Sequence, residues 1–379
     1  MTPHKPKILY LVTEDWYFCS HRLSLACSAR DAGYDVVVAT RVRNHAGHIT
    51  GEGLRLIPIE LSRRSKNPFM ELGFLFDLIS LYRSERPDIV HHVALKPVIY
   101  GSVAAKVAGV PSVVNALTGM GYVFTSRELL AKALRPLIET IFRFVLNLGN
   151  SRLIIQNPDD IEMLVSANII KPERAVLIRG SGVDIEKFSF EPEPAGTPLV
   201  VMVSRLLWDK GVKEFVDAAG LIKENETAAR FVVVGEADCE NPAAISQGQL
   251  EEWRKNSAVE FWGHSDNVAG ILKQAHIVCL PSYREGLPKV LIEAAACGRP
   301  IVTTDVQGCR EAVRHGVNGL LVPARDFKAL SKALALIIAD KQLRLDMGAK
   351  GREMAESEFS TGKVVKDTLA VYDNLLAKA

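Results

Sequence analysis

The chain has 379 residues, 48% of them hydrophobic and 24% charged, which is the composition of a globular protein long enough for two domains. Its formal net charge is +2, with 23 Lys and Arg against 18 Asp and Glu in residues 1–190 and 23 against 26 in the remainder. The mildly basic first part is compatible with anionic lipid or phosphate partners and is far too weak to indicate a nucleic-acid-binding protein.

The cysteines form no CxxC pair and show no metal-ligand spacing, which favours buried thiols in a reducing compartment. They are Cys19, Cys27, Cys239, Cys279, Cys297 and Cys309. The first apolar run, Ile8–Val12, is strand-length, and no apolar run reaches the roughly 18 residues of a membrane span. We therefore expect a cytoplasmic protein without a signal peptide.

In the first half of the chain, short apolar strands alternate with helical patterns. A helix is expected over about 21–32, and the expected strands cover 7–12, 35–39, 54–58, 89–92, 112–117, 152–156 and 175–178. Strands that are apolar on both faces and separated by helices indicate a parallel sheet covered by helices.

Residues 191–198 contain three prolines and a glycine, and we expect the domain linker here. The alternation then restarts, with strands expected at 199–203, 231–234, 259–262, 277–280, 301–303 and 319–322. The sequence therefore predicts two doubly wound, Rossmann-like α/β domains over 1–190 and 191–360, with a helix at about 361–379 that can pack back on the first. Ligands of such sheets bind beyond the carboxyl ends of the strands.

The segment Pro281–Gly298 follows an expected strand, and Pro288 suits the first turn of the next helix. Unpaired amides at a helix start favour a phosphate. A carboxylate so near a phosphate must face hydroxyl groups, which suits a donor sugar for Glu285 and a ribose for Glu293. The alternative is a pair of solvated glutamates, since acidic residues favour first turns.

The segment Ser204–Gly211 begins where the strand over 199–203 ends, which places Arg205 and Lys210 at the same edge of the sheet as Glu285. Two cations can neutralise a diphosphate without a metal, at roughly 1.5–3 kcal/mol per charge-assisted hydrogen bond. The chain has no Asp-x-Asp metal motif, so we expect neither a metal nor a cofactor. The alternative is a surface Arg and Lys beside a turn.

Both segments resemble glycosyltransferase family 4, through the two glutamates separated by seven residues and the Ser-Arg-Leu-x-x-x-Lys-Gly run. The resemblance extends along the whole chain and implies the GT-B fold, with two Rossmann-like domains facing across a cleft, and transfer with retention of anomeric configuration. It also implies that Arg205 and Lys210 hold the diphosphate, Glu293 the ribose and Glu285 the transferred sugar. Further donor-binding residues implied by the likeness are Gly235, Asp266, Gly286 and Leu287.

The first half carries the candidate acceptor site. Residues 13–22 follow the first strand without the glycine pair that many family members have there, which puts a close backbone approach to the donor in doubt. An aromatic acceptor platform is one interpretation, and aromatic residues of the core are the other. The candidate acceptor-binding residues are Trp16, Tyr17, Phe18, His21 and Arg22.

His91 and His92 are expected at the end of a strand, where many family members have a histidine. A neutral imidazole there could polarise an acceptor hydroxyl, so both are candidate catalytic residues, and the alternative is that both are structural. Thr118 and Gly119 follow the next strand, and Thr118 is a candidate for contact with the donor sugar.

Two stretches bear on membranes, because basic residues lie beside apolar ones in 62–79 and in 127–150. They can dock on anionic headgroups or, alternatively, be helices that face the core. Four segments resemble the family members that extend polyprenyl-diphosphate-linked sugars at the cytoplasmic membrane face, such as bacterial N-acetylgalactosaminyltransferases. These segments are Leu61–Phe69, Leu207–Phe215, Glu240–Pro242 and Leu280–Gly286.

The leading hypothesis is a retaining transferase that moves an N-acetylhexosamine such as GalNAc from UDP to a polyprenyl-diphosphate-linked glycan in bacterial surface polysaccharide or glycan biosynthesis. It would associate peripherally with the inner face of the cytoplasmic membrane. The alternatives are a GT-B nucleotide-sugar epimerase and a nucleotide-sugar-binding subunit without turnover. A dinucleotide-dependent dehydrogenase is disfavoured because no G-x-G-x-x-G follows the first strand of either half.

Overall fold

The computed structural model describes residues 5–61, 68–117, 129–238 and 241–378. The chain divides into two compact units. Unit 1 comprises Met1–Ser181 together with Thr361–Ala379, and unit 2 comprises Gly182–Ser360. The C-terminal residues therefore return to the unit in which the chain begins.

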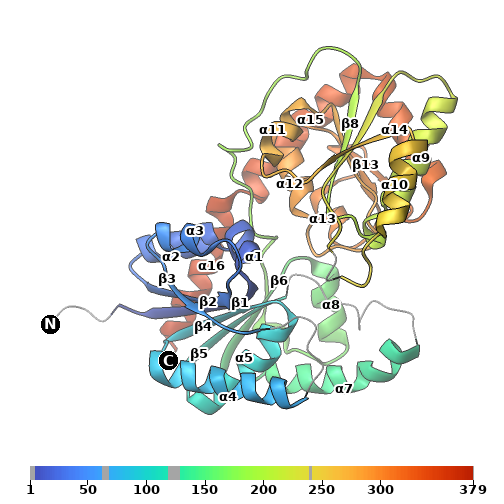
Figure 1. The fold of residues 1–379 in the computed structure, drawn as a ribbon. Coiled ribbons are helices and arrows are strands. Elements are labelled where there is room, and N and C mark those ends of the chain that lie inside the picture. Colours follow the sequence, from blue (N-terminus) through green and yellow to red (C-terminus); the bar gives the residue numbers. More distant parts are fainter. Residues whose placement is uncertain (1–4, 62–67, 118–128, 239–240, 379) are drawn as a thin grey trace. The chain divides into compact units, whose positions relative to one another are not determined.

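Within its described residues, unit 1 is built on a sheet of seven parallel strands in the order β3-β2-β1-β4-β5-β6-β7 (Figure 1). The strands are β1 (Lys7–Glu14), β2 (Asp35–Arg41), β3 (Arg55–Pro58), β4 (Ile89–Val93), β5 (Ser112–Leu117), β6 (Asn150–Ile155) and β7 (Ala175–Leu177). The strand order reverses direction between β1 and β4, so the loops after these two strands flank the position where such sheets bind ligands.

Helices cover both faces of this sheet. They are α1 (Asp15–His21), α2 (Leu23–Asp31), α3 (Ala46–Gly51), α4 (Pro68–Glu85), α5 (Leu95–Ala108), α7 (Leu129–Val145), α8 (Pro158–Ser166), η1 (Pro172–Arg174) and α16 (Thr361–Leu376). Side chains of β1 alternate between the two faces. Tyr10 packs in a core with residues of α2 and α16, whereas Leu9 and Leu11 pack in a core with residues of α4 and α5.

Unit 2 contains a second parallel sheet, of six strands in the order β10-β9-β8-β11-β12-β13 within its described residues. The strands are β8 (Leu199–Val203), β9 (Arg230–Val234), β10 (Val259–Gly263), β11 (Ile277–Leu280), β12 (Ile301–Thr304) and β13 (Gly319–Val322). The strand order reverses between β8 and β11, which places the loops after these two strands at the expected ligand position.

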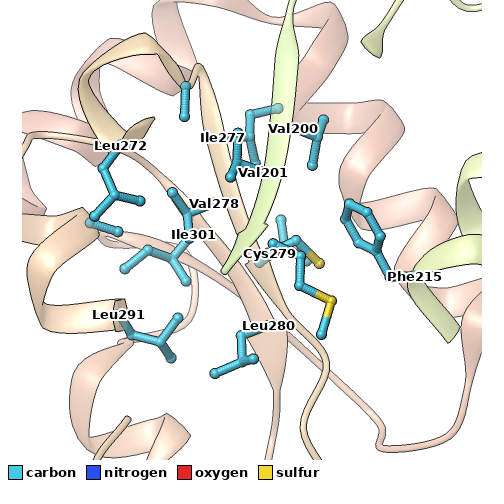
Figure 2. Close-up of a cluster of buried hydrophobic side chains, with 14 of the residues drawn as sticks. Val200, Val201, Phe215, Leu272, Ile277, Val278, Cys279, Leu280, Leu291 and Ile301 are labelled. Atoms are coloured by element: carbon cyan, nitrogen blue, oxygen red, sulfur yellow. The ribbon is translucent and has the colours of Figure 1, made fainter. Parts of the chain in front are cut away.

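The helices of unit 2 are η2 (Trp208–Lys210), α9 (Val212–Glu224), α10 (Gln247–Asn256), α11 (Val268–Gln274), α12 (Lys289–Ala296), α13 (Cys309–Ala312), α14 (Phe327–Ala339) and α15 (Lys341–Glu358). Figure 2 shows why β8 and β11 are apolar on both faces: Val200, Val201 and Val278 lie between Phe215 of α9 and Leu291 of α12. The prediction of two doubly wound parallel sheets is confirmed.

The proline-rich stretch 191–198 belongs to unit 2, since the chain divides before it. Both Nε and Nη2 of Arg344 donate to the carboxylate of Glu193, at 2.6 and 3.0 Å, and both side chains are at most 7% exposed. Arg299, which is buried, donates to the carbonyl of Pro192. This stretch is therefore held against unit 2 by two buried arginines, whereas its proline and glycine content predicted a linker.

Candidate functional site

Two loops meet at the point where the strand order of unit 2 reverses. The loop Ser204–Gly211 follows β8, and the loop Pro281–Pro288 follows β11. The backbone N–H of Tyr283 and the hydroxyl of Ser282 both donate to the carbonyl of Asp209, at 2.8 and 3.0 Å. Gly211 has a φ of +76°, and a Cβ there would lie 2.1 Å from the carbonyl oxygen of Pro281. Only glycine allows the two loops to approach this closely.

The close approach brings Lys210 and Glu285 together. Lys210 Nζ donates to Glu285 Oε1 at 2.5 Å, and the two side chains are 15% and 12% exposed. The loop after β12 packs against this pair: the backbone N–H of Glu285 donates to the carbonyl of Gln307, and a Cβ on Gly308 would lie 2.3 Å from the carbonyl of Gly286. The structure thus unites the cation and one of the carboxylates that the sequence analysis singled out.

Tyr283 supports the position of Glu285, and sequence reasoning missed it. Its hydroxyl donates to Glu214 Oε1 on α9 at 2.7 Å, and the guanidinium of Arg325 lies 4.5 Å from the ring centroid. Burial, followed by the contact with Glu214, raises the pKa of Tyr283, so the hydroxyl stays protonated and donates. A tyrosine two residues before the glutamate is the signal that could have found this contact.

Glu293 lies on α12, and Pro288 is the N-cap residue of this helix, one position before the expected first turn. The Glu293 side chain is 9% exposed, and its Oε1 lies 3.5 Å from Lys289 Nζ. Burial raises the pKa of Glu293 despite the nearby lysine. Gly286 and Leu287, just before the helix, are buried as well.

The remaining expected donor residues of unit 2 lie in different settings. Gly235, after β9, has a φ of +142°, and a Cβ there would lie 1.8 Å from the carbonyl of Ser204, so the loops after β8 and β9 also touch. Arg205 is 46% exposed and donates to Asp238 at 2.9 Å. Asp266 is fully exposed. Arg205 and Asp266 are therefore accessible side chains, whereas Gly235 shapes the backbone.

In unit 1, the residues after β1 are organised by a buried carboxylate. Asp15 accepts hydrogen bonds from the backbone N–H groups of Trp16, Arg43 and His45 at 2.7, 2.7 and 2.9 Å. Burial acts to raise the pKa of Asp15, but these three hydrogen bonds outweigh it and lower the pKa below its usual value. The preceding Glu14 is paired with Arg41. Sequence reasoning missed Asp15, although an acidic residue at the start of a helix is a recognisable signal.

The aromatic residues of α1 divide into two groups. Trp16, Tyr17 and His21 are half-buried, with the Tyr17 and His21 rings stacked at 4.2 Å and the Trp16 and Tyr17 rings edge to face at 5.6 Å. Phe18 is fully buried and contacts Tyr10 edge to face at 6.0 Å. The first group presents partly exposed rings, and Phe18 belongs to the core, as the alternative interpretation had it.

His92 is fully buried within unit 1. Its Nδ1 is 2.8 Å from Asn115 Oδ1, and its Nε2 is 3.0 Å from the hydroxyl of Tyr82. A Cβ on Gly101 would lie 2.5 Å from the ring, so α5 packs directly on it. Burial lowers the pKa of His92 to about 4. Since both ring nitrogens are engaged, these contacts favour the structural alternative for His92.

His91 points to the opposite face of the sheet and is 1% exposed. It pairs with Tyr10 in mid-strand rather than ending β4, and its Nδ1 is 2.5 Å from the hydroxyl of Tyr372 on α16. Burial, followed by the nearby charge of Arg22, lowers the pKa of His91 well below its usual value. The imidazole is therefore neutral. Thr118, the other candidate near this edge, lies outside the described residues, as do Gly119 and part of the segment 62–79.

In the described part of the chain, no helix has both the length and the apolar character needed to cross a membrane, and no group of three or more His, Cys, Asp or Glu side chains is arranged to hold a metal. The described cysteines are free thiols, and Cys279, Cys297 and Cys309 are buried. Cys239 lies outside the described residues.

The sequence is similar to bacterial glycosyltransferases along most of its length. The Campylobacter jejuni N,N'-diacetylbacillosaminyl-diphospho-undecaprenol alpha-1,3-N-acetylgalactosaminyltransferase is 28% identical over 94% of this chain and 95% of its own. The Escherichia coli UDP-Gal:alpha-D-GlcNAc-diphosphoundecaprenol alpha-1,3-galactosyltransferase is 28% identical over 81% and 80%. A Staphylococcus aureus capsular polysaccharide biosynthesis glycosyltransferase is 23% identical over 82% and 83%.

The fold is also that of known glycosyltransferase structures. A sucrose-phosphate synthase from Thermosynechococcus elongatus superposes with a TM-score of 0.81 at 21% identity, over 99% of this chain and all of that one. A Rickettsia africae glycosyltransferase superposes with a TM-score of 0.79 at 17% identity, with the same coverage. Residues 7–157 match the glycosyl transferase 4-like family, and residues 184–354 match glycosyl transferases group 1. The chain therefore belongs to glycosyltransferase family 4, a family of retaining enzymes with the GT-B fold.

Proposed function

We propose that this glycosyltransferase moves a sugar from a UDP-sugar to a polyprenyl-diphosphate-linked glycan in the synthesis of a bacterial surface polysaccharide or glycan. The observation that carries the donor assignment is the Lys210–Glu285 pair, held 2.5 Å apart at the reversal point of the unit 2 sheet. A cation and a carboxylate placed together can bind a diphosphate and the hydroxyl groups of the attached sugar.

In this proposal, the donor diphosphate replaces Glu285 as the partner of Lys210. Glu285 is then released to accept hydrogen bonds from hydroxyl groups of the transferred sugar. Arg205, which is exposed and hydrogen-bonded to Asp238, supplies a second cation. The N-terminal end of α12 adds the positive end of a helix dipole.

The rest of the donor pocket follows from the positions of the neighbouring loops. Glu293 is proposed to accept hydrogen bonds from the ribose hydroxyls, since its burial makes a bare charge unfavourable and a hydroxyl donor favourable. The remaining proposed donor contacts are Gly235, Asp266, Gly286, Leu287 and Thr118.

The acceptor is proposed to bind on unit 1, beyond β1. The half-buried rings of Tyr17 and His21 are stacked, with Trp16 edge to face against Tyr17, and aromatic rings offer sugars an apolar face with polar edges. Phe18 belongs to the core cluster against which Tyr17 packs. A lipid-linked acceptor is supported by the C. jejuni and E. coli relatives, whose names specify diphospho-undecaprenol acceptors.

The transferred sugar is proposed to be an N-acetylhexosamine such as GalNAc, as in the C. jejuni relative; the E. coli relative, equally identical, transfers galactose. The test is to incubate the purified chain with UDP-GalNAc, UDP-GlcNAc, UDP-Gal or UDP-Glc and an undecaprenyl-diphosphate-linked N-acetylhexosamine. Mass spectrometry should detect an acceptor extended by one N-acetylhexosamine. Conversion of the UDP-sugar without any acceptor would instead identify an epimerase, and donor binding without any product would identify a binding subunit.

Membrane association is proposed to use the outer face of α4, α5 and α7, which cover one side of the unit 1 sheet (Figure 1). The exposed large apolar side chains there are Met70, Leu72, Phe76, Val107 and Phe144. Exposed Arg83, Lys106 and Arg143 on the same helices complement anionic headgroups.

Flotation with phosphatidylglycerol vesicles tests this surface. We expect binding that falls when Phe76 and Phe144 are both changed to Ser. The control is Leu336→Ser, which changes an exposed apolar residue of α14 in unit 2 and should leave binding intact. Equal vesicle binding by the parent protein, the double variant and the control would reject this surface as the membrane-binding site. A protein that binds membranes through this surface is proposed to lie at the inner face of the cytoplasmic membrane.

A further inference from the structure

Arg22 is a buried cation without a carboxylate partner in the described part of the chain. The residue is 5% exposed, its Nη1 donates to the carbonyl of His21 at 3.3 Å, and its Nε has no hydrogen-bond partner in the parts of the chain that the structure describes. The nearest carboxylates in sequence are occupied elsewhere, Glu14 by Arg41 and Asp15 by backbone amides. A buried guanidinium is costly unless an anion compensates its charge.

Arg22 lies within a cluster of polar side chains between the sheet and α16. Its backbone N–H donates to the carbonyl of Phe18, whose ring contacts Tyr10 edge to face. Tyr10 in turn stacks on His91, with the ring centroids 5.1 Å apart. The charge of Arg22 contributes to the low pKa of His91, after burial. The hydroxyl of Tyr372 is 3.0 Å from the hydroxyl of Tyr10 and 2.5 Å from His91 Nδ1. These contacts fix the imidazole and leave its buried Nε2 without a hydrogen-bond partner among the residues that the structure describes.

A third buried polar atom on this face has no partner among the described residues. Thr40 on β2 lies two residues after Val38, which packs in the same core as Tyr10, so strand alternation places Thr40 on that face. Its Oγ1 makes no hydrogen bond. Buried polar atoms are normally satisfied, so Arg22 Nε, Thr40 Oγ1 and His91 Nε2 together indicate a missing polar ligand.

We propose that Arg22 and His91 form a binding site for a diphosphate, the one that links the acceptor sugar to its polyprenyl chain. The planar guanidinium can bind phosphate oxygens with two parallel hydrogen bonds. When Tyr372 donates to Nδ1, the neutral imidazole carries its proton on Nε2 and donates it to a phosphate oxygen. His91 then has a binding role, rather than a structural role or the role of polarising the acceptor hydroxyl.

The site adjoins the proposed sugar platform. Arg22 follows His21 directly, and His21 stacks on Tyr17. A sugar on these rings and the diphosphate attached to it can therefore occupy neighbouring positions. This inference rests on the proposed function for its choice of ligand, because the anion is assigned to the acceptor rather than to the donor.

The test measures binding of inorganic pyrophosphate to the full chain by calorimetry, with saturating UDP so that the donor site is filled. We expect Arg22→Met to weaken pyrophosphate binding at least about tenfold, or about 1.4 kcal/mol. The matched control is Arg30→Met, in the last turn of the helix that follows Arg22, because Arg30 is paired with Asp31, and it should bind as the parent protein does.

Thermal unfolding separates this site from a structural arginine. Without pyrophosphate, Arg22→Met should unfold at the same or a higher temperature than the parent, because an uncompensated buried charge has been removed. Pyrophosphate should raise the Tm of the parent and not that of the variant. A structural arginine would give a lower Tm and unchanged binding, which overturns the proposal.

Further outcomes are equally decisive. If Arg22→Met fails to fold, Arg22→Lys, which keeps the charge and loses the planar fork, is expected to bind pyrophosphate more weakly than the parent, and unchanged binding would overturn the site. Weaker UDP binding by either variant would assign Arg22 to the donor and overturn the acceptor assignment. Pyrophosphate binding that needs Arg22 in a protein without transferase activity would reject the proposed function and leave the anion site standing.

Discussion

Replacing Lys210 with Met removes the ammonium group and keeps most of the apolar stem. The group lies 2.5 Å from Glu285 and is 15% exposed, so it acts in a largely desolvated position. A hydrogen bond from such a cation to a phosphate is worth roughly 1.5–3 kcal/mol, which corresponds to a loss of about 10- to 100-fold in UDP affinity. The same change leaves the Glu285 carboxylate without its cation and should lower the free energy of unfolding by about 1–3 kcal/mol.

Titration calorimetry with UDP measures the first effect, and urea denaturation measures the second. The control is Lys213→Met, three residues along, because Lys213 is 54% exposed and its ion pair with Asp217 lies within α9. It should change neither quantity by more than about 0.5 kcal/mol. An unchanged UDP affinity in Lys210→Met would refute the assignment of this lysine to the diphosphate.

Three further predictions concern the surroundings of this pair. Gly211→Ala should abolish UDP binding and destabilise unit 2, because the new Cβ would clash with the Pro281 carbonyl and the residue has a positive φ. The control Gly220→Ala, at a mid-helix position of α9 where a Cβ meets no other atom, should be neutral or stabilising, and denaturation with and without UDP compares the two variants. Glu293→Gln should weaken UDP binding yet raise the Tm at pH 7.5. Because the pKa of Glu293 is raised in the folded state, the fold loses stability as the pH rises from about 4.5 through the raised pKa, and the loss is constant above it, so a Tm–pH series should be flatter in the variant. Arg344→Met should cost about 3–5 kcal/mol in denaturant unfolding, because it leaves the buried Glu193 unpaired, and a loss below about 1 kcal/mol would contradict this account.

The fold could be predicted from the sequence because its signal is local. Strands such as β8 and β11 are buried on both faces, so they are continuous apolar runs bounded by polar loops. The same regularity placed Lys210 and Glu285 at one sheet edge, since the carboxyl ends of parallel strands share an edge. The resemblance to a known family indicated the type of reaction, and the strand pattern indicated where in the fold the site lies.

The two histidines of β4 show what the local sequence pattern does not predict. His91 and His92 are adjacent, so they point to opposite faces of the sheet, and the sequence does not say which face is covered by what. The structure covers one face with α16, from the far end of the chain, and supplies Tyr372 to His91. It covers the other with α5, whose Gly101 lies against His92. Burial by distant segments is a property of the tertiary fold and has no local pattern.

The pairing of Lys210 with Glu285 also lies beyond local sequence, and it bears on the order of events at the proposed site. Free UDP must separate this ion pair, and because UDP carries no sugar, it provides no hydroxyl groups to donate hydrogen bonds to the Glu285 carboxylate. A UDP-sugar gives the lysine its phosphate and the glutamate its hydroxyl groups at once. Once the sugar has been transferred, the glutamate has lost its new partner and competes again for the lysine, which favours release of UDP. Glu285→Gln should therefore bind free UDP as tightly as the parent or more tightly, and lose turnover by about 100-fold or more. Equal losses in UDP binding and in turnover would mean that the glutamate only holds the loop in place.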